Sequence, residues 1–148
     1  MRNSRGFTLI ETLITTAVLV SGLCALVMLF WYSIGRNNMN QQQTAATLLL
    51  YEKMEQFKST PLTNAMWTAG GGLNTTAPTN GYFEYADIAA DGALTTSAVD
   101  TTMDYLRLWQ ISGTNTRTLT VIVCVNRSGM TRDRFELARA TTMVSNGF

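Results

Sequence analysis

Histidine is missing from this chain, and cysteine and proline are rare: the 148 residues contain no histidine, two cysteines and two prolines. Without histidine, the chain lacks the commonest general base and the imidazole metal ligand, which excludes histidine-based catalysis and histidine-bound metals. The sequence also contains no G-x-S-x-G nucleophile elbow and no residues at metal-ligand spacing. We therefore expect a protein that is not an enzyme and that carries no metal or other cofactor.

Charge is also scarce and nearly balanced. Eleven lysine and arginine side chains stand against ten aspartate and glutamate side chains, and the formal net charge is +1. This balance offers no basic footprint for nucleic acid. The arginines near the C-terminus are Arg127, Arg132, Arg134 and Arg139. Because Asp133 and Glu136 are interleaved with them, a solvated strand face explains them better, and nucleic acid is not an expected partner.

Charge is scarcest from residue 7 to residue 35, where Glu11 is the only charged side chain among 29 residues. A helix needs roughly 20 apolar residues to cross a bilayer core, so this stretch predicts a single membrane-spanning helix. A secretory signal peptide would have a shorter apolar core, followed by a cleavage site with small residues. Arg2 and Arg5 precede the span, and positive charge tends to stay in the cytoplasm. The N-terminus is therefore expected inside and everything after Arg36 outside.

Glu11 needs an explanation, because an ionisable group within an apolar span is costly. It lies only about 6 Å of helix rise from Phe7, which places it near one face of the membrane. Two interpretations remain open. The carboxylate can simply favour a helix N-terminus through the helix dipole. Alternatively, cleavage after Gly6 would free an amino group on Phe7, and Glu11 could pair with it inside one helix or between neighbouring helices.

The residues around Glu11 form a recognisable motif that follows a short basic leader. The motif reads Gly6-Phe7-Thr8-Leu9-Ile10-Glu11. With the long apolar helix behind it, it resembles the start of a type IV pilin or pseudopilin precursor. The resemblance implies a leader peptide over residues 1–6, cleavage by a prepilin peptidase between Gly6 and Phe7, and N-methylation of Phe7. It also implies that Glu11 pairs with the N-terminal amine of an adjacent subunit during assembly.

A second helical segment is predicted over residues 36–59, where Pro61 ends the helix. Apolar side chains recur along it at helical spacing and form one stripe: Met39, Ala46, Leu50, Met54 and Phe57. The run from Leu48 to Tyr51 widens this stripe. Most of the polar side chains of this segment are expected to face away from the stripe: Gln41, Gln42, Gln43, Glu52, Lys53 and Glu55. Such a stripe typically faces a protein core, so this segment should pack on a domain outside the membrane.

The stretch from residue 62 to residue 104 is rich in turn-forming residues and has little regular pattern. We expect a loop region here, which the resemblance implies is the variable part of the domain. Only Tyr82 to Tyr85 suggests a short strand. The glycine triplet Gly70 to Gly72 lacks the lysine and the spacing of a phosphate-binding loop.

Residues 105–141 predict an antiparallel meander of three strands. Tyr105 to Ile111 alternates in β fashion, with Arg107 among the residues on the Tyr105 face. The runs Thr118 to Val125 and Arg134 to Ala140 follow after short polar turns. The expected fold is therefore α+β and pilin-like, with a long N-terminal helix packed on a small antiparallel sheet.

The two cysteines are Cys24, inside the apolar span, and Cys124, inside a predicted strand. A residue at membrane depth cannot easily approach a domain outside, so we expect no disulfide between them. Many major pilins close a C-terminal loop with a disulfide. By this comparison, the chain resembles a minor component.

Later segments are similar to the minor pilins called type IV pilus modification proteins, the PilV type. These segments are Thr12-Leu13-Ile14, Ala45-Ala46, Glu52-Lys53-Met54-Glu55, Leu106-Arg107-Leu108-Trp109 and Thr118-Leu119-Thr120-Val121-Ile122-Val123. The resemblance implies a minor pilin, a structural subunit that helps initiate, cap or modify type IV pilus assembly. A minor pseudopilin of a type II secretion system is one alternative. A single-span envelope protein with an adhesin or enzyme role is another.

The resemblance also implies a location and a set of partners. The protein would sit in the bacterial inner membrane through residues 7–35, with its N-terminus cytoplasmic and residues 36–148 periplasmic, and would then enter a pilus or pseudopilus. Its partners would be other pilin or pseudopilin subunits, contacted through the N-terminal helix. The prepilin peptidase and the inner-membrane assembly platform would also bind it.

Overall fold

The computed structural model describes residues 8–89, 91–126 and 135–145. These residues form one long helix, α1, a short 3-10 helix, η1, and a set of strands. Their bounds are α1 Leu9–Lys58, η1 Ala65–Trp67, β1 Gly70–Gly71, β2 Phe83–Ile88, β3 Leu94–Ser97, β4 Tyr105–Ser112, β5 Thr116–Val125 and β6 Glu136–Ser145. The chain divides into two compact units, Met1–Asn40 and Gln41–Phe148, and α1 contributes to both.

In the first unit, several hydroxyl groups of α1 donate hydrogen bonds within the helix itself. Those of Thr12, Thr15 and Ser21 donate to backbone carbonyls three or four residues earlier, at 2.7 to 2.8 Å. This local bonding lets threonine and serine stand in an apolar helix without seeking other partners. The α+β fold predicted from the sequence begins with this helix.

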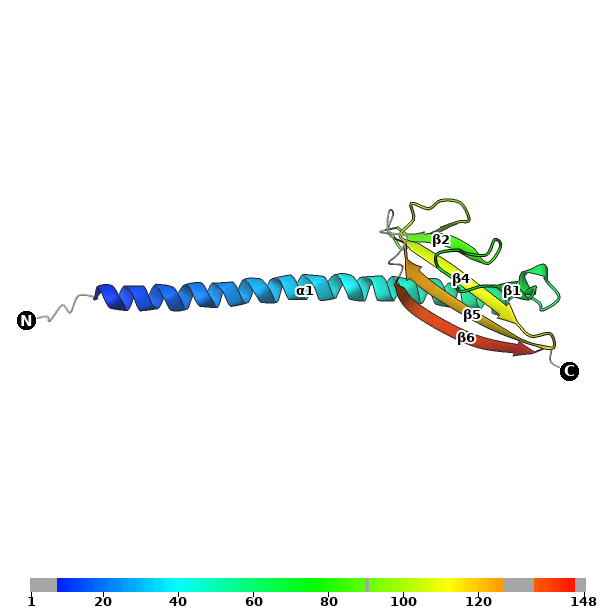
Figure 1. Ribbon diagram of the computed structural model, residues 1–148, viewed down its shortest axis with the longest axis horizontal. Coiled ribbons are helices and arrows are strands. Elements are labelled where there is room, and N and C mark those ends of the chain that lie inside the picture. The colour runs from blue at the N-terminus through cyan, green and yellow to red at the C-terminus, as the bar shows by residue number, and fades with distance from the viewer. Residues whose placement is uncertain (1–7, 90, 127–134, 146–148) are drawn as a thin grey trace, which may run out of the picture. The chain divides into compact units, whose positions relative to one another are not determined.

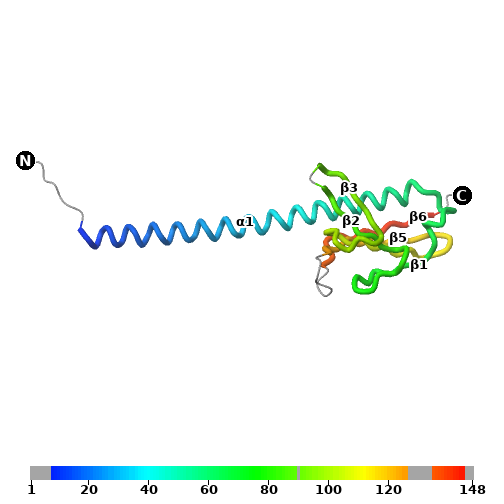
Figure 2. The backbone as a smooth tube through the Cα atoms, turned by 90° about the horizontal axis from the view of Figure 1, so that it is seen from above, coloured from blue at the N-terminus to red at the C-terminus, as the bar shows by residue number. Residues whose placement is uncertain are grey.

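The second unit is built on one antiparallel sheet with the strand order β3-β2-β4-β5-β6. One edge of β4 pairs with β2 along its first half and with β1 at its end, where Gly70 lies opposite Ile111. The other edge of β4 pairs with β5, which pairs in turn with β6. The predicted three-strand meander is therefore present, and β2 and β3 extend it (Figure 1; β3 is labelled in Figure 2).

The C-terminal part of α1 covers one face of this sheet (Figures 1 and 2). Most of the predicted stripe is confirmed, because Ala46, Leu50, Met54 and Phe57 are all buried. Met39 was expected in the same stripe, but its side chain is 56% exposed. The buried residues that the sheet contributes to this core are Ala86, Tyr105, Trp109, Ile111, Leu119, Val121 and Val123.

The opposite face of the sheet has a second, smaller core. Its buried residues are Tyr85, Leu106, Leu108, Ile122 and Cys124. Leu73 and Met103 pack against it from the connecting segments. The sheet therefore has two apolar faces, which explains why β4 is buried at nearly every position.

Residues 62–104 contain more regular structure than the sequence suggested. They hold η1, β1, β2 and β3, and the strand expected from Tyr82 to Tyr85 runs instead from Phe83 to Ile88. The glycine triplet begins with β1, which passes under the ring of Tyr82. A Cβ atom on Gly71, whose φ is +83°, would lie 2.4 Å from the carbonyl oxygen of Trp109. Only glycine fits there, because the backbone needs both a positive φ and this close approach.

The third meander strand differs in its bounds from the prediction. β6 runs from Glu136 to Ser145, and Phe135, expected within it, precedes it and is exposed. Within β6, Arg139 makes a surface ion pair with Glu136 at 2.7 Å. Of the predicted basic cluster, Arg127, Arg132 and Arg134 lie outside the described residues.

Candidate functional site

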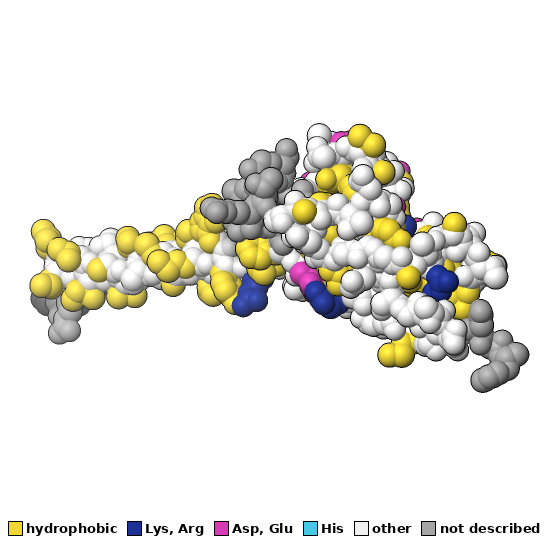
Figure 3. All heavy atoms as spheres, turned by 45° about the vertical axis from the view of Figure 1, so that its right-hand side comes forward, with side chains coloured by type: hydrophobic (Ala, Val, Ile, Leu, Met, Phe, Trp, Pro, Cys, Tyr) yellow, Lys and Arg dark blue, Asp and Glu magenta, His cyan; other side chains and the backbone are white. Residues whose placement is uncertain are grey.

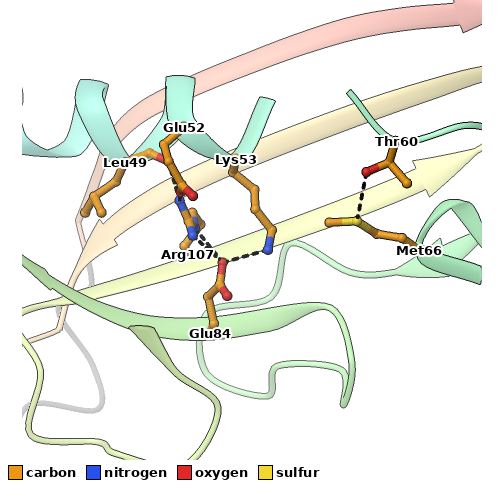
Figure 4. A network of polar contacts seen from close by, with 7 residues as sticks. All are labelled: Leu49, Glu52, Lys53, Thr60, Met66, Glu84 and Arg107. Atoms are coloured by element: carbon orange, nitrogen blue, oxygen red, sulfur yellow. Dashed lines mark hydrogen bonds and ion pairs between the residues drawn. The ribbon is translucent and has the colours of Figure 1, made fainter. Parts of the chain in front are cut away.

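A group of charged side chains lies between α1 and the sheet, within the second unit (Figure 4). Glu84 on β2 and Arg107 on β4 are opposite each other in the strand register. The Arg107 Nε group donates to the Glu84 carboxylate at 2.7 Å. Lys53 on α1 binds the same carboxylate at 2.9 Å. Arg107 also binds the Glu52 carboxylate on α1, so two cations and two anions form one balanced network.

The network ties the helix to the sheet at a defined register. Arg107, whose side chain is only 1% exposed, also donates to the backbone carbonyl of Leu49 in the C-terminal part of α1. Lys53 lies 4.1 Å from the centre of the Trp109 ring, a cation–π contact. Sliding α1 by one turn along the sheet would separate these partners. We therefore name these four residues, Glu52, Lys53, Glu84 and Arg107, the helix clamp.

The helix clamp was not anticipated from the sequence. Most of the polar side chains of this helical segment were expected to face away from the stripe, but Lys53 is an exception because it is only 4% exposed. A signal was available: Lys53 lies four residues after Leu49 and four before Phe57, so all three share one helix face. Arg107 was placed on the correct face of its strand, but no role was assigned to it. Pairing it with Glu84 required knowledge of the strand register.

Burial lowers the pKa of Lys53, because the protein interior disfavours its charged form. The nearby Glu84 carboxylate opposes this change, and the Arg107 guanidinium adds to it. Burial acts in the opposite direction on Tyr105, whose pKa is raised, with Asp104 and Asp87 adding to the effect. Both shifts make the unfolding free energy of the second unit depend on pH in the alkaline range.

Replacing Lys53 with methionine is expected to remove one pH-dependent contribution to stability. Between the lowered pKa of Lys53 and its ordinary value of about 10.4, the unfolded chain binds more protons than the folded one. The unfolding free energy of fragment 41–148, relative to its Lys53→Met variant, should therefore rise with pH across this window. The Tyr105 contribution, which falls above about pH 10, is shared by both proteins and cancels. Urea unfolding at a series of pH values measures this difference, and parallel curves would contradict the assignment.

The first unit presents a different kind of surface. Its apolar side chains from Leu9 to Ile34 are exposed on every side of α1. Figure 3 shows hydrophobic side chains along the length of this part of the helix. The helix includes an 18-residue window with a mean hydropathy of 2.5, none of it buried within the structure. Its length and composition are sufficient to cross a membrane, as the sequence predicted.

Glu11 lies in the first turn of this helix. Its backbone N–H donates to the carbonyl of Thr8 at 3.0 Å, and its own carbonyl accepts from the Thr15 hydroxyl at 2.7 Å. The side chain is exposed. The next charged residue along the chain is Arg36, about 37 Å further at 1.5 Å per residue. If the predicted leader is removed, the N-terminal amine is therefore the only cation of the same span that could reach the Glu11 carboxylate.

Residues 1–29 match the family model of the prokaryotic N-terminal methylation motif. The match includes the predicted leader, the predicted cleavage site and Glu11. It supports a pilin-like or pseudopilin-like protein with a prepilin signal, and the apolar helix fits membrane anchoring. No curated protein and no solved structure is significantly similar to the chain.

Glu11 belongs both to the motif and to the described part of the chain. The predicted processing residues precede the described part. Gly6 and Phe7 lie outside the described residues, so cleavage between them and methylation of Phe7 remain predictions. α1 begins at Leu9, only two residues after Phe7. The helix clamp lies beyond the matched segment.

Proposed function

We propose that this protein is a minor pilin, a structural subunit that helps initiate, cap or modify a type IV pilus after prepilin peptidase cleavage. The observation that carries the proposal is the methylation motif over residues 1–29, which overlaps an apolar stretch, residues 7–35, whose only charged residue is Glu11. A helix that is apolar on all sides needs lipid or other helices around it. A membrane followed by a filament of packed helices supplies both environments in turn.

The buried charges of the second unit agree with the proposed structural role. Its buried charges are satisfied by one another, and in the described ranges no buried side-chain nitrogen or oxygen is without a hydrogen-bond partner. The helix clamp holds the sheet on the part of α1 that belongs to the same unit. Force applied along the helix would thereby reach the domain.

The proposed location follows from the same residues. The precursor spans the bacterial inner membrane with its N-terminus in the cytoplasm and residues 36–148 in the periplasm. Prepilin peptidase removes residues 1–6 and methylates Phe7, and the assembly platform transfers the subunit into a pilus. Other pilin subunits contact it through α1.

Replacing Glu11 with glutamine tests the assembly role of its carboxylate. The variant keeps the shape of the side chain and removes the charge that would pair with the Phe7 amine of an adjacent subunit. The variant leaves the Phe7 amine of the adjacent subunit without its carboxylate partner. A charge without a partner is costly in an apolar environment. We expect normal insertion and cleavage, but several-fold less variant in sheared filaments at equal membrane levels. Immunoblots of membranes and sheared pili measure both quantities.

The control separates processing from assembly. A Gly6→Val variant should remain uncleaved, because the bulky side chain blocks the predicted site, and mass spectrometry of the N-terminus shows this directly. Maturation of Gly6→Val to Phe7 would mean that the cleavage site is wrong. Equal incorporation of Glu11→Gln and the original protein would mean that Glu11 only favours the start of the helix and has no role in assembly. If the protein were recovered only with a type II secretion apparatus and not in sheared pili, the pseudopilin alternative would be favoured.

A further inference from the structure

The apolar stretch of α1 ends in a cluster of aromatic residues followed by one cation. Trp31 and Tyr32 are 74% and 62% exposed, and Arg36 follows one turn later. Tryptophan and tyrosine are enriched where a membrane helix passes from hydrocarbon into the headgroup layer. Arg36 is the only basic residue between Arg5 and Lys53. This end of the stretch therefore has the composition of a membrane boundary.

The side chain of Arg36 folds back onto Tyr32. Its Nε group donates to the Tyr32 hydroxyl at 2.9 Å, and its guanidinium carbon lies 5.1 Å from the centre of the ring. Side chains on a helix point toward its N-terminus, so the guanidinium lies at the level of Tyr32, nearer the apolar stretch than its own backbone. A guanidinium has five N–H donors, and the Tyr32 hydroxyl accepts from one of them. A strong hydrogen-bond acceptor at this level could accept from the remaining N–H groups of Arg36.

The spacing from Glu11 matches the thickness of a bilayer. Trp31 is 20 residues after Glu11, which is about 30 Å of helix. The hydrocarbon core of a bilayer is also about 30 Å thick. When Glu11 lies at one boundary of the core, the indole of Trp31 and the Tyr32–Arg36 pair lie at the other.

We propose that Trp31, Tyr32 and Arg36 form an interfacial anchor in which the Arg36 guanidinium, held on the Tyr32 ring, binds the phosphate of a lipid headgroup. The proposal rests on the membrane location given under the proposed function. Guanidinium and phosphate are complementary in charge and in geometry, and headgroup phosphates lie at the boundary where the aromatic residues place Arg36. The anchor sets the depth of α1, and it thereby holds Glu11 at the opposite boundary until the subunit leaves the membrane.

Tryptophan fluorescence of the full-length protein in phosphatidylcholine vesicles can test the anchor. Bromine atoms are placed on the acyl chains either near the headgroup or near the terminal methyl group, and they quench only a tryptophan that they contact. Trp67 is fully buried and Trp109 is 8% exposed, so the quenchable emission should come from Trp31. Trp31→Phe should abolish the quenching and verify this assignment. In the original protein, we expect shallow bromines, near the headgroup, to quench the Trp31 emission more strongly than deep bromines, near the terminal methyl group.

The role of Arg36 is tested by substitution and by removal of phosphate. Arg36→Gln should lose the preference for shallow bromines, whereas Lys58→Gln, which removes an exposed cation from the second unit, should retain it. Bilayers of a galactosyl diacylglycerol contain no phosphate. In them, shallow and deep bromines should quench the original protein's Trp31 emission in the same ratio as they quench that of Arg36→Gln. Persistence of the Arg36-dependent preference in these bilayers would overturn phosphate as the ligand.

The outcomes separate the anchor from the proposed function. If neither bromine position quenches Trp31, the helix does not enter the bilayer as far as this residue, and both proposals fail. If Trp31 is quenched identically in Arg36→Gln and in the original protein, the helix is inserted but the anchor is wrong. That second result would leave Arg36 to contact a neighbouring subunit, and the minor pilin proposal would stand.

Discussion

Replacing Phe57 with alanine is expected to lower the unfolding free energy of the second unit by about 3 to 5 kcal/mol, the usual cost of deleting a buried aromatic side chain. Phe57 is fully buried, as the sequence predicted. Its ring lies edge-on against two indoles, with centroid distances of 5.1 Å to Trp67 and 6.2 Å to Trp109. Its loss leaves a cavity bounded by helix, sheet and η1, and none of these elements can easily move to fill it.

The measurement is urea unfolding of fragment 41–148, followed by the fluorescence of the two indoles that Phe57 contacts. Tyr51→Ala is the matched control, because Tyr51 is an aromatic residue on the same helix that is 62% exposed. The control should change the free energy by less than about 1 kcal/mol, as surface substitutions usually do. If both variants had the same midpoint, α1 would not be docked on the sheet through Phe57.

A second large effect is expected at the centre of the helix clamp. Glu84→Gln keeps the shape of the side chain but removes the charge shared by Lys53 and Arg107. Two buried cations then lie near each other, and only Arg107 retains a carboxylate partner, Glu52. Breaking a buried ion pair by removing one partner typically costs about 3 to 5 kcal/mol. We expect a loss of about 3 kcal/mol, since Glu52 compensates in part.

Glu55→Gln is the control for the clamp, because it removes a carboxylate from the same helix at the surface. The Glu55–Lys58 pair is an exposed i,i+3 contact at 3.1 Å, and such pairs contribute only about 0.2 to 1 kcal/mol. Urea unfolding at neutral pH compares the two variants. A Glu84→Gln protein as stable as Glu55→Gln would show that the buried charges do not hold the helix in place.

The sequence alone determined the first unit. Its apolar length, the isolated Glu11 and the methylation motif are properties of consecutive residues, and a helix satisfies its own backbone wherever it lies. The prediction of an apolar helix near the N-terminus therefore needed no knowledge of the rest of the chain. The same locality explains why the faces of β4 were predicted correctly, since alternation along a strand is also a property of neighbouring residues.

Strand content between residues 62 and 104 depended on distant partners. β1 and β2 become strands because both pair with β4, which lies further along the chain, whereas β3 pairs with β2 across a short turn. The Asp91-Gly92 pair and the threonines of β3 do favour a turn followed by a strand. They do not specify β4 as the partner of β2, and that pairing depends on the tertiary structure.

The helix clamp was decided entirely by the tertiary structure. Charged residues are rarely buried without partners, so most polar side chains of this helical segment were expected to face away from the core, and the sequence did not single out Lys53 as buried. Its partner Glu84 is 31 residues away in the chain and comes within 2.9 Å only after β2 pairs with β4 and α1 covers the sheet. A buried charge is stable only where an opposite charge meets it, and that meeting is a property of the fold and not of the neighbouring sequence.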